Sequence, residues 1–151
     1  MSKKKIKLDR KPGLYLKDTD HKGRGVFCTQ DIRKGEILEV TPTIILNKSA
    51  SEAVEDTILG NYVFQIGAIS KAHRKQLGIT DISKCCGVIM GIISYFNHAE
   101  KPNAEVEWEE HDGTLYHQVR ALANIPKNTE ICTTYGNGWF KDRKDTIKHH
   151  K

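Results

Sequence analysis

Residues suited to binding a ligand or to catalysis gather between Tyr95 and Asn103. This stretch holds an aromatic pair, an amide, an imidazole and a proline followed by a second amide, and it directly follows the apolar run Val88–Ile93. Asn, His and Pro are poor residues for the interior of a helix or strand. A polar cluster behind a buried run is typical of a binding loop on a core element. A plain turn at Lys101–Asn103 explains the same residues, so this stretch alone leaves both interpretations open.

A glycine turn that leads into a strand, Lys22–Thr29, is the second candidate. Gly23 and Gly25 allow positive φ or a close approach of the backbone to a partner. The segment lacks the third glycine and the helix of a dinucleotide-binding fold, and it lacks the Gly-Lys-Ser/Thr of a phosphate loop. On its own it therefore does not define a ligand.

The charges separate the two ends of the chain from its body. The net charge is +5, residues 1–11 carry +5 and residues 141–151 carry +3, so residues 12–140 carry −3. A nucleic-acid-binding domain usually places basic charge on its folded face, so we expect only weak contact with nucleic acid, through the tails. The acidic block Glu105–Asp112 around Trp108 would attract a basic partner, although a solvated hairpin explains it equally well.

The length and composition predict one folded domain within the cell. The 151 residues are enough for a single domain with a core. No apolar run approaches the ~18 residues of a membrane span, and no signal-peptide core follows the basic N-terminus. Whether the protein is cytoplasmic or nuclear stays open. The cysteines have no zinc-ligand spacing, so we expect reduced, mostly buried thiols and no metal: Cys28, Cys85, Cys86 and Cys132.

The elements that must position these candidates are mostly short strands. Residues 1–12 are expected to be a disordered basic tail and residues 141–151 a charged C-terminal tail. Between them, an α-containing insert at about 48–86 interrupts β-rich ends, with one helix that starts at a capping box, Ser49–Glu52, and is closed by Gly60. The remaining predicted elements are strands at 14–16, 26–29, 36–38, 62–66, 104–109, 115–122 and 131–135, and a short helix at 70–76 closed by Gly78.

One turn pattern occurs twice. Asp31–Leu38 and Asn124–Ile131 each place an Asx residue, an isoleucine and a basic residue before Gly35 or Asn128, and a Glu-Ile strand start follows. Gly and Asn are the residues that accept a left-handed backbone in such turns. The pattern is too short to define a repeat architecture.

Taken in order, these motifs resemble a SET domain, the fold of one class of protein lysine methyltransferases, over residues 13–140. Gly23–Phe27 matches the first motif, Asn97–Ala99 stands where the family usually has Asn-His-Ser, and Arg120 to Gly136 matches the closing motif. The resemblance implies a mainly β, β-clip-like fold of short sheets whose C-terminal segment threads past the Asn97 loop as a pseudoknot. No cysteine-rich module flanks the motifs, as in the compact members, so the family's structural zincs are not expected.

The resemblance also implies transfer of a methyl group from S-adenosylmethionine to a lysine of a histone or another basic protein. Tyr135 takes the position of the catalytic tyrosine. The residues implied for the methyl donor are Lys22, Gly23, Arg24, Gly25, Asn97, His98 and Trp139. Trp139 could instead wall the lysine channel, and hydrophobic capping of the core explains it as well. Those implied for the lysine channel are Tyr62, Phe64, Tyr95 and Thr133, although plain core packing explains the three aromatic residues as well. Thr133 stands where many members carry Phe or Tyr, so we expect room for more than one methyl group.

Two other functions stay open. Ala99 in place of Ser and the unusual Thr133 are compatible with an inactive SET-fold binding module. The basic tails are compatible with a nucleic-acid-binding or scaffold protein. A homodimer is also open, because small members of the family pair.

Overall fold

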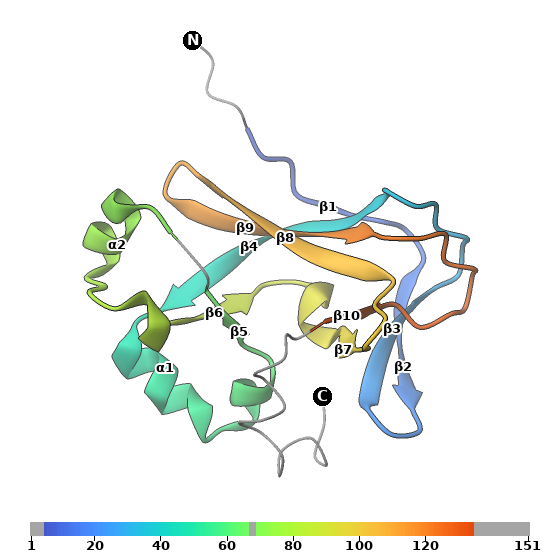
Figure 1. Cartoon of the computed structure of the whole chain (residues 1–151), viewed down its shortest axis with the longest axis horizontal. Helices are drawn as coiled ribbons and strands as arrows, with labels where there is room; N and C mark the ends of the chain where they lie inside the picture. Colours follow the sequence, from blue (N-terminus) through green and yellow to red (C-terminus); the bar gives the residue numbers. More distant parts are fainter. Residues whose placement is uncertain (1–4, 67–68, 135–151) are drawn as a thin grey trace.

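The computed structural model describes residues 5–66 and 69–134, and this part of the chain is built mainly from short β-strands (Figure 1). The strands are β1 (Asp9–Arg10), β2 (Leu14–Thr19), β3 (Gly23–Cys28), β4 (Ile37–Leu46), β5 (Phe64–Gln65), β6 (Cys86–Ile89), β7 (Asn97–His98), β8 (Ala104–His111), β9 (Thr114–Ala121) and β10 (Cys132–Thr133). The helices are α1 (Lys48–Glu55) and α2 (Lys71–Leu77), with the 3-10 turns η1 (Ile58–Asn61), η2 (Ile82–Lys84) and η3 (Ile92–Tyr95). In the described ranges, no helix is long and apolar enough to span a membrane.

The largest sheet has the strand order β5-β6-β4-β9-β8, and β1 adds to β4 beyond the end of β6. β9 buries every second residue, as its period-two sequence predicts. β8 and β9 form the predicted hairpin around Asp112 and Gly113, whose φ values of 53° and 78° are those of a tight two-residue turn. Ile93 and Phe96, in the segment between β6 and β7, lie fully buried in the main core.

The expectation of a disordered tail over residues 1–12 is wrong at its C-terminal end. Asp9 and Arg10 form β1, antiparallel to β4, and the Lys11 amide donates to the Leu38 carbonyl oxygen at 2.8 Å. The charge count favoured a tail because two-residue strands carry no periodic signal. Their pairing is decided by the open edge of β4.

The insert between β4 and β6 holds both helices, on one side of the molecule in Figure 1. α1 begins earlier than predicted, because Asn47 rather than Ser49 is its N-cap and accepts from the Ala50 amide at 2.9 Å. It also ends earlier, and Gly60 lies in η1 instead of closing the helix. α2 follows the prediction: Ser70 caps its start, and Gly78 ends it in the left-handed region at φ 68°.

The two similar turns lie against each other. Ile32 and Ile125 exchange both backbone hydrogen bonds, at 2.9 and 2.8 Å. Gly35 has φ 88° and Asn128 has φ 61°, so the left-handed backbone predicted for both residues is confirmed. The second turn brings the chain back beside β3, where the Ile131 amide donates to the Val26 carbonyl oxygen at 2.8 Å.

Candidate functional site

Asn97 is the residue on which the site is built. It is 4% exposed, and its Nδ2 atom donates to the Arg24 carbonyl oxygen at 3.1 Å and to Glu130 Oε1 at 2.8 Å. One amide group therefore ties the glycine turn, β7 and the closing segment together, although these segments are far apart in the sequence. A buried amide with satisfied donors fixes its loop, because leaving it unpaired would cost about 1–3 kcal/mol.

The glycine turn approaches this amide so closely that a side chain on Gly25 would displace its neighbours. A Cβ atom on Gly25 would lie 2.5 Å from Glu130 Oε1 and 3.1 Å from Asn97 Nδ2. Gly23 has φ 67°, a conformation that favours glycine. Glycine is therefore suited to the two positions for different reasons. Gly23 adopts the positive φ of the turn, and Gly25 leaves room for the Glu130 carboxylate.

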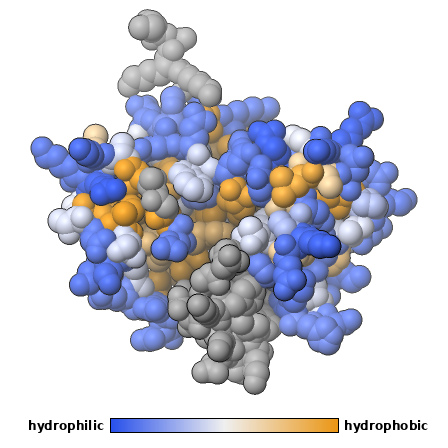
Figure 2. Space-filling view, viewed as in Figure 1, coloured by the Kyte–Doolittle hydropathy of each residue, from blue (hydrophilic) through white to orange (hydrophobic). Residues whose placement is uncertain are grey.

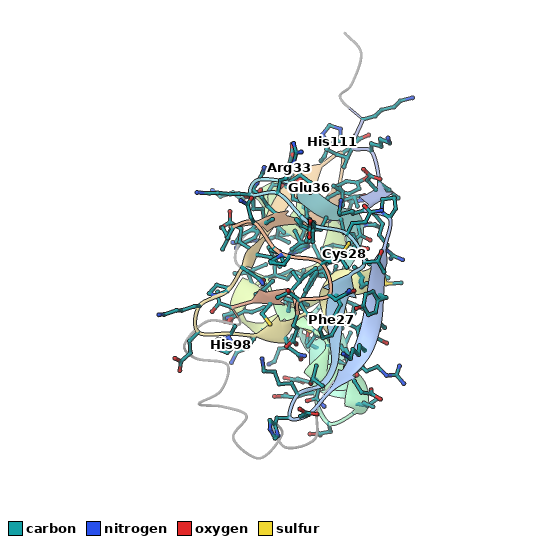
Figure 3. All side chains as sticks on the ribbon, turned by 90° about the vertical axis from the view of Figure 1, so that its right-hand side faces the viewer. Phe27, Cys28, Arg33, Glu36, His98 and His111 are labelled. Carbon is teal, nitrogen blue, oxygen red and sulfur yellow. The ribbon has the colours of Figure 1, made fainter. Side chains whose placement is uncertain are left out.

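Two cationic side chains flank the turn. Lys22 Nζ lies 3.4 Å from the His98 carbonyl oxygen and 3.7 Å from Glu130 Oε2. Arg24 is largely exposed, and its 3.9 Å ion pair with the exposed Asp18 contributes little to stability. Burial lowers the pKa of the His98 imidazole; the nearby Glu100 charge opposes this and Lys22 assists it, so the net shift favours the neutral ring. In Figure 3, His98 lies in the lower half of the view, away from Arg33 and Glu36 in the upper half.

The aromatic candidates form a group beside the turn. The rings of Tyr62 and Tyr95 meet edge to face with centroids 5.5 Å apart. Phe64 and Tyr95 are half-buried against the main core. Burial and then Tyr95 raise the pKa of the Tyr62 hydroxyl, and the nearby Arg24 charge opposes this. In Figure 2, the middle of this face, around β5, β6 and η3, is apolar and rimmed by hydrophilic residues.

The closing strand β10 runs parallel to β7, with Cys132 beside Asn97 and Thr133 beside His98. Thr133 is 1% exposed, and its Oγ1 atom has no hydrogen-bond partner among the residues that the structure describes. The Ala99 amide donates to the Thr133 carbonyl oxygen at 2.9 Å. This contact uses only backbone atoms, so the replacement of Ser by Ala leaves it intact.

The sequence candidates thus divide into three sets. Lys22, Gly25 and Asn97 meet at Glu130, and Lys22 also reaches the His98 carbonyl oxygen. The Tyr62–Tyr95 ring pair adjoins Arg24 of the turn. Thr133 lies alongside in β10. Tyr135 and Trp139 lie outside the described residues, as does the predicted threading beyond residue 134. Among the residues that the structure does describe, no three His, Cys, Asp or Glu side chains gather as a metal site.

Two residues of the site escaped the sequence analysis. Glu130 was noted only as part of a motif and as the start of a strand, yet its carboxylate joins Asn97, Lys22 and the space before Gly25. Asn103 was assigned to a turn, yet its side chain donates to the Glu130 carbonyl oxygen at 2.9 Å and accepts from the Cys132 amide at 2.8 Å. The sequence signal that could have identified Glu130 and Asn103 was their position within two of the motifs.

Comparison with known proteins defines the class. The family model of the SET domain matches residues 23–136. The chain belongs to the SET-domain family, and both the predicted fold class and the predicted class of enzyme, a protein lysine methyltransferase, are confirmed.

One curated relative is the histone-lysine N-methyltransferase of Schizosaccharomyces pombe that is specific for lysine 37 of histone H3. It is 31% identical over 140 residues, which cover 91% of this chain and 83% of the relative.

Two solved structures share the fold. A candidate histone methyltransferase of Plasmodium falciparum has a TM-score of 0.58 at 24% identity, covering 86% of this chain and 98% of that one. The Neurospora SET-domain protein DIM-5, a histone lysine methyltransferase, has a TM-score of 0.63 at 18% identity, covering 85% of this chain and 54% of that one. At these identities the likeness concerns the fold alone.

Proposed function

We propose that this protein transfers methyl groups from S-adenosylmethionine to lysine residues of a histone or a similarly basic protein inside the cell. The observation that carries the proposal is the meeting of the glycine turn, Asn97 and Glu130 beside the Tyr62–Tyr95 ring pair. The family and the printed specificity of the Schizosaccharomyces pombe relative support the type of substrate.

The residues at the turn fit a donor that carries both a carboxylate and positive charge. The cations of Lys22 and Arg24 suit a carboxylate, and the Glu130 carboxylate, which lies against Gly25, suits a cationic group. We assign the amine and adenine of the donor to Asn97 and His98, with Trp139 stacking on the adenine. When bound, S-adenosylmethionine supplies an electrophilic methyl group.

The lysine substrate must lose its proton before it can act as a nucleophile. A lysine pKa near ~10.4 makes the neutral amine cost roughly 4–5 kcal/mol at pH 7. An aromatic channel of Tyr62, Phe64 and Tyr95 would exclude water, disfavour the ammonium and orient the amine. The raised pKa of Tyr62 supports this assignment, because its first cause is burial of the hydroxyl.

Thr133 would set the free space at the end of this channel. Its side chain is small and fully buried, and its hydroxyl has no partner among the described residues. Threonine is smaller than the Phe or Tyr that many members of the family carry at this position, so it would leave more room at the reacting amine. We therefore propose that the enzyme adds more than one methyl group.

Calorimetry with S-adenosylmethionine and methyl transfer to histones test the proposal. We expect donor binding and methylated lysine in the wild-type protein, with di- or trimethyl product in the mass spectrum at long times. Tyr135→Phe should lower turnover by at least about tenfold at near-normal donor affinity, because the hydroxyl would orient the amine.

Tyr116→Phe in β9 is the matched control and should retain turnover. Unchanged turnover in Tyr135→Phe would reject the role of that residue. A wild-type protein that does not bind the donor would instead favour an inactive binding module.

A further inference from the structure

Glu39 in β4 is a carboxylate with almost no contact with water. It is 1% exposed, accepts from the Ile93 amide at 3.1 Å through Oε1 and pairs with Arg10 Nε at 2.7 Å through Oε2. A buried carboxylate is unfavourable unless it is paired and hydrogen-bonded. Both of its partners are therefore needed, and they come from two segments that are far apart in the sequence.

The first partner belongs to η3. Gly91 is the N-cap of this 3-10 turn and makes no side-chain capping hydrogen bond, so Glu39 caps the turn from a neighbouring strand. A Cβ atom on Gly91 would collide with Glu39 Oε1, so glycine here makes room for the carboxylate. η3 ends at Tyr95 and leads directly into Asn97. The carboxylate thus holds the base of the candidate site.

The second partner belongs to β1. Arg10 lies opposite Glu39 in the β1–β4 pairing, and its half-exposed side chain balances the buried charge. Its neighbour Lys11 makes a different ion pair, at 2.6 Å, with Glu36. The two adjacent cations of the N-terminal segment therefore act on different acids, and only Arg10 acts on the carboxylate that caps η3.

We propose that Arg10 and Glu39 form a positioning pair that fixes η3, and through it Tyr95 and Asn97. The N-terminal segment is then a working part of the catalytic domain. The pair touches neither the proposed donor nor the lysine. The effect on turnover rests on the function proposed above, whereas the effect on the order of η3 does not.

Hydrogen exchange followed by mass spectrometry tests the pair without any activity. Arg10→Ala leaves the buried carboxylate without its cation, so we expect the segment 91–99 to exchange at least about fivefold faster, with the β8–β9 hairpin unchanged. Turnover at saturating donor and histone should fall by a similar factor. Lys11→Ala removes the same charge from the adjacent residue and should change neither quantity.

Two further variants separate positioning from a general loss of stability. Arg10→Lys keeps the charge and should restore most of the protection in segment 91–99. Arg10→Ala combined with Glu39→Gln removes the unpaired charge but keeps an acceptor for the Ile93 amide, so exchange should return to within about twofold of wild type.

Equal acceleration in Lys11→Ala and Arg10→Ala, or unchanged exchange of segment 91–99 in Arg10→Ala, would overturn the proposal. A wild-type protein without methyl transfer would contradict the proposed function. The hydrogen-exchange comparison would still show whether Arg10 and Glu39 fix η3.

Discussion

Asn97 shows how much of this site depends on single polar atoms. Its Nδ2 atom serves two acceptors, the Arg24 carbonyl oxygen and the Glu130 carboxylate. Neither acceptor is near Asn97 in the sequence, so the side chain fixes the glycine turn and the closing segment relative to each other. A hydrogen bond to a charged group contributes about 1.5–3 kcal/mol, which makes the Glu130 contact the stronger of the two.

Gly25→Ala should disturb the site more than the fold. The added methyl group would lie 2.5 Å from Glu130 Oε1, which is the end of a flexible side chain. The carboxylate can turn away, but it then loses the Asn97 amide. We expect a loss of about 1–2 kcal/mol in unfolding free energy and at least about tenfold weaker donor binding by calorimetry.

Gly35→Ala is the control for backbone strain, because Gly35 has φ 88° and no atom within 4 Å of an added Cβ. It should lower stability by about 1 kcal/mol without weakening donor binding. Equal weakening in both variants would show that stability, rather than the Glu130 contact, controls the site.

At this scale the motifs pointed to residues with a local structural signal and missed those that act at a distance. Gly23, Gly25 and Asn97 were found because their types are unusual at their places. Glu130 and Asn103 were not assigned a role, because a glutamate before a strand and an asparagine in a turn are ordinary. Their roles depend on which segments lie opposite, and that is a property of the folded chain.

Among the elements, the paired turns around Gly35 and Asn128 direct two strands into the core. The Ile32–Ile125 pairing fixes them together, and the Asn128 amide donates to the Cys28 carbonyl oxygen at 2.7 Å. The second turn thereby sets where Ile131 meets Val26, and hence where β10 lies. This course of the chain requires a left-handed backbone at residue 128.

Replacing Asn128 tests that condition. Both Asn128→Gly and Asn128→Ala lose the hydrogen bond from the Tyr15 hydroxyl, which is 2.9 Å long and exposed. Only alanine is strained at φ 61°, so Asn128→Ala should be less stable than Asn128→Gly by about 1 kcal/mol in urea unfolding. Tyr15→Phe removes only this hydrogen bond and therefore measures its contribution to stability. Equal losses in the two Asn128 variants would contradict a left-handed requirement.

The elements with a strong local signal were predicted and those held by tertiary contacts were not. The β8–β9 hairpin has both alternation and turn residues, and α2 has a cap at each end. β1 has two residues, and β5 is shorter than the strand predicted over 62–66, because Phe64 and Gln65 pair only where β6 is available. The start of α1 was misplaced because Asn47 and Ser49 are both good caps, and sequence alone does not choose between them.

For the molecule as a whole, the centre of the main sheet carries a buried titratable group. His117 in β9 is 5% exposed, with its Nδ1 atom against the Thr43 hydroxyl and its ring 6.3 Å from that of Trp108. Burial lowers the pKa of the imidazole from 6.5 to about 4. Between these values the unfolded chain binds more protons than the folded one, so stability falls as the pH decreases.

The expected size of this effect is measurable. Between pH 7 and pH 5, His117 should cost the wild-type protein about 2 kcal/mol of unfolding free energy. Protonation of carboxylates such as Glu107, whose pKa is lowered by the Gln118 and Arg120 contacts, also lowers the stability of the protein in acid. The comparison is therefore made with His117→Gln, whose loss in urea unfolding over the same range should be smaller by that amount. Identical pH dependence in the two proteins would contradict a buried neutral imidazole.

The parallel pairing of β10 with β7 has a consequence for how the protein is made. A ribosome synthesises β3 and the Asn97 loop before Glu130, Cys132 and Thr133. The position of β3 and of the Asn97 loop in the site depends on these later residues. Such distant contacts form slowly, because much chain must be ordered first. During translation the sheet can therefore assemble early while the donor site stays unformed. The proposed donor site would therefore form only after residues 130–133 have been synthesised.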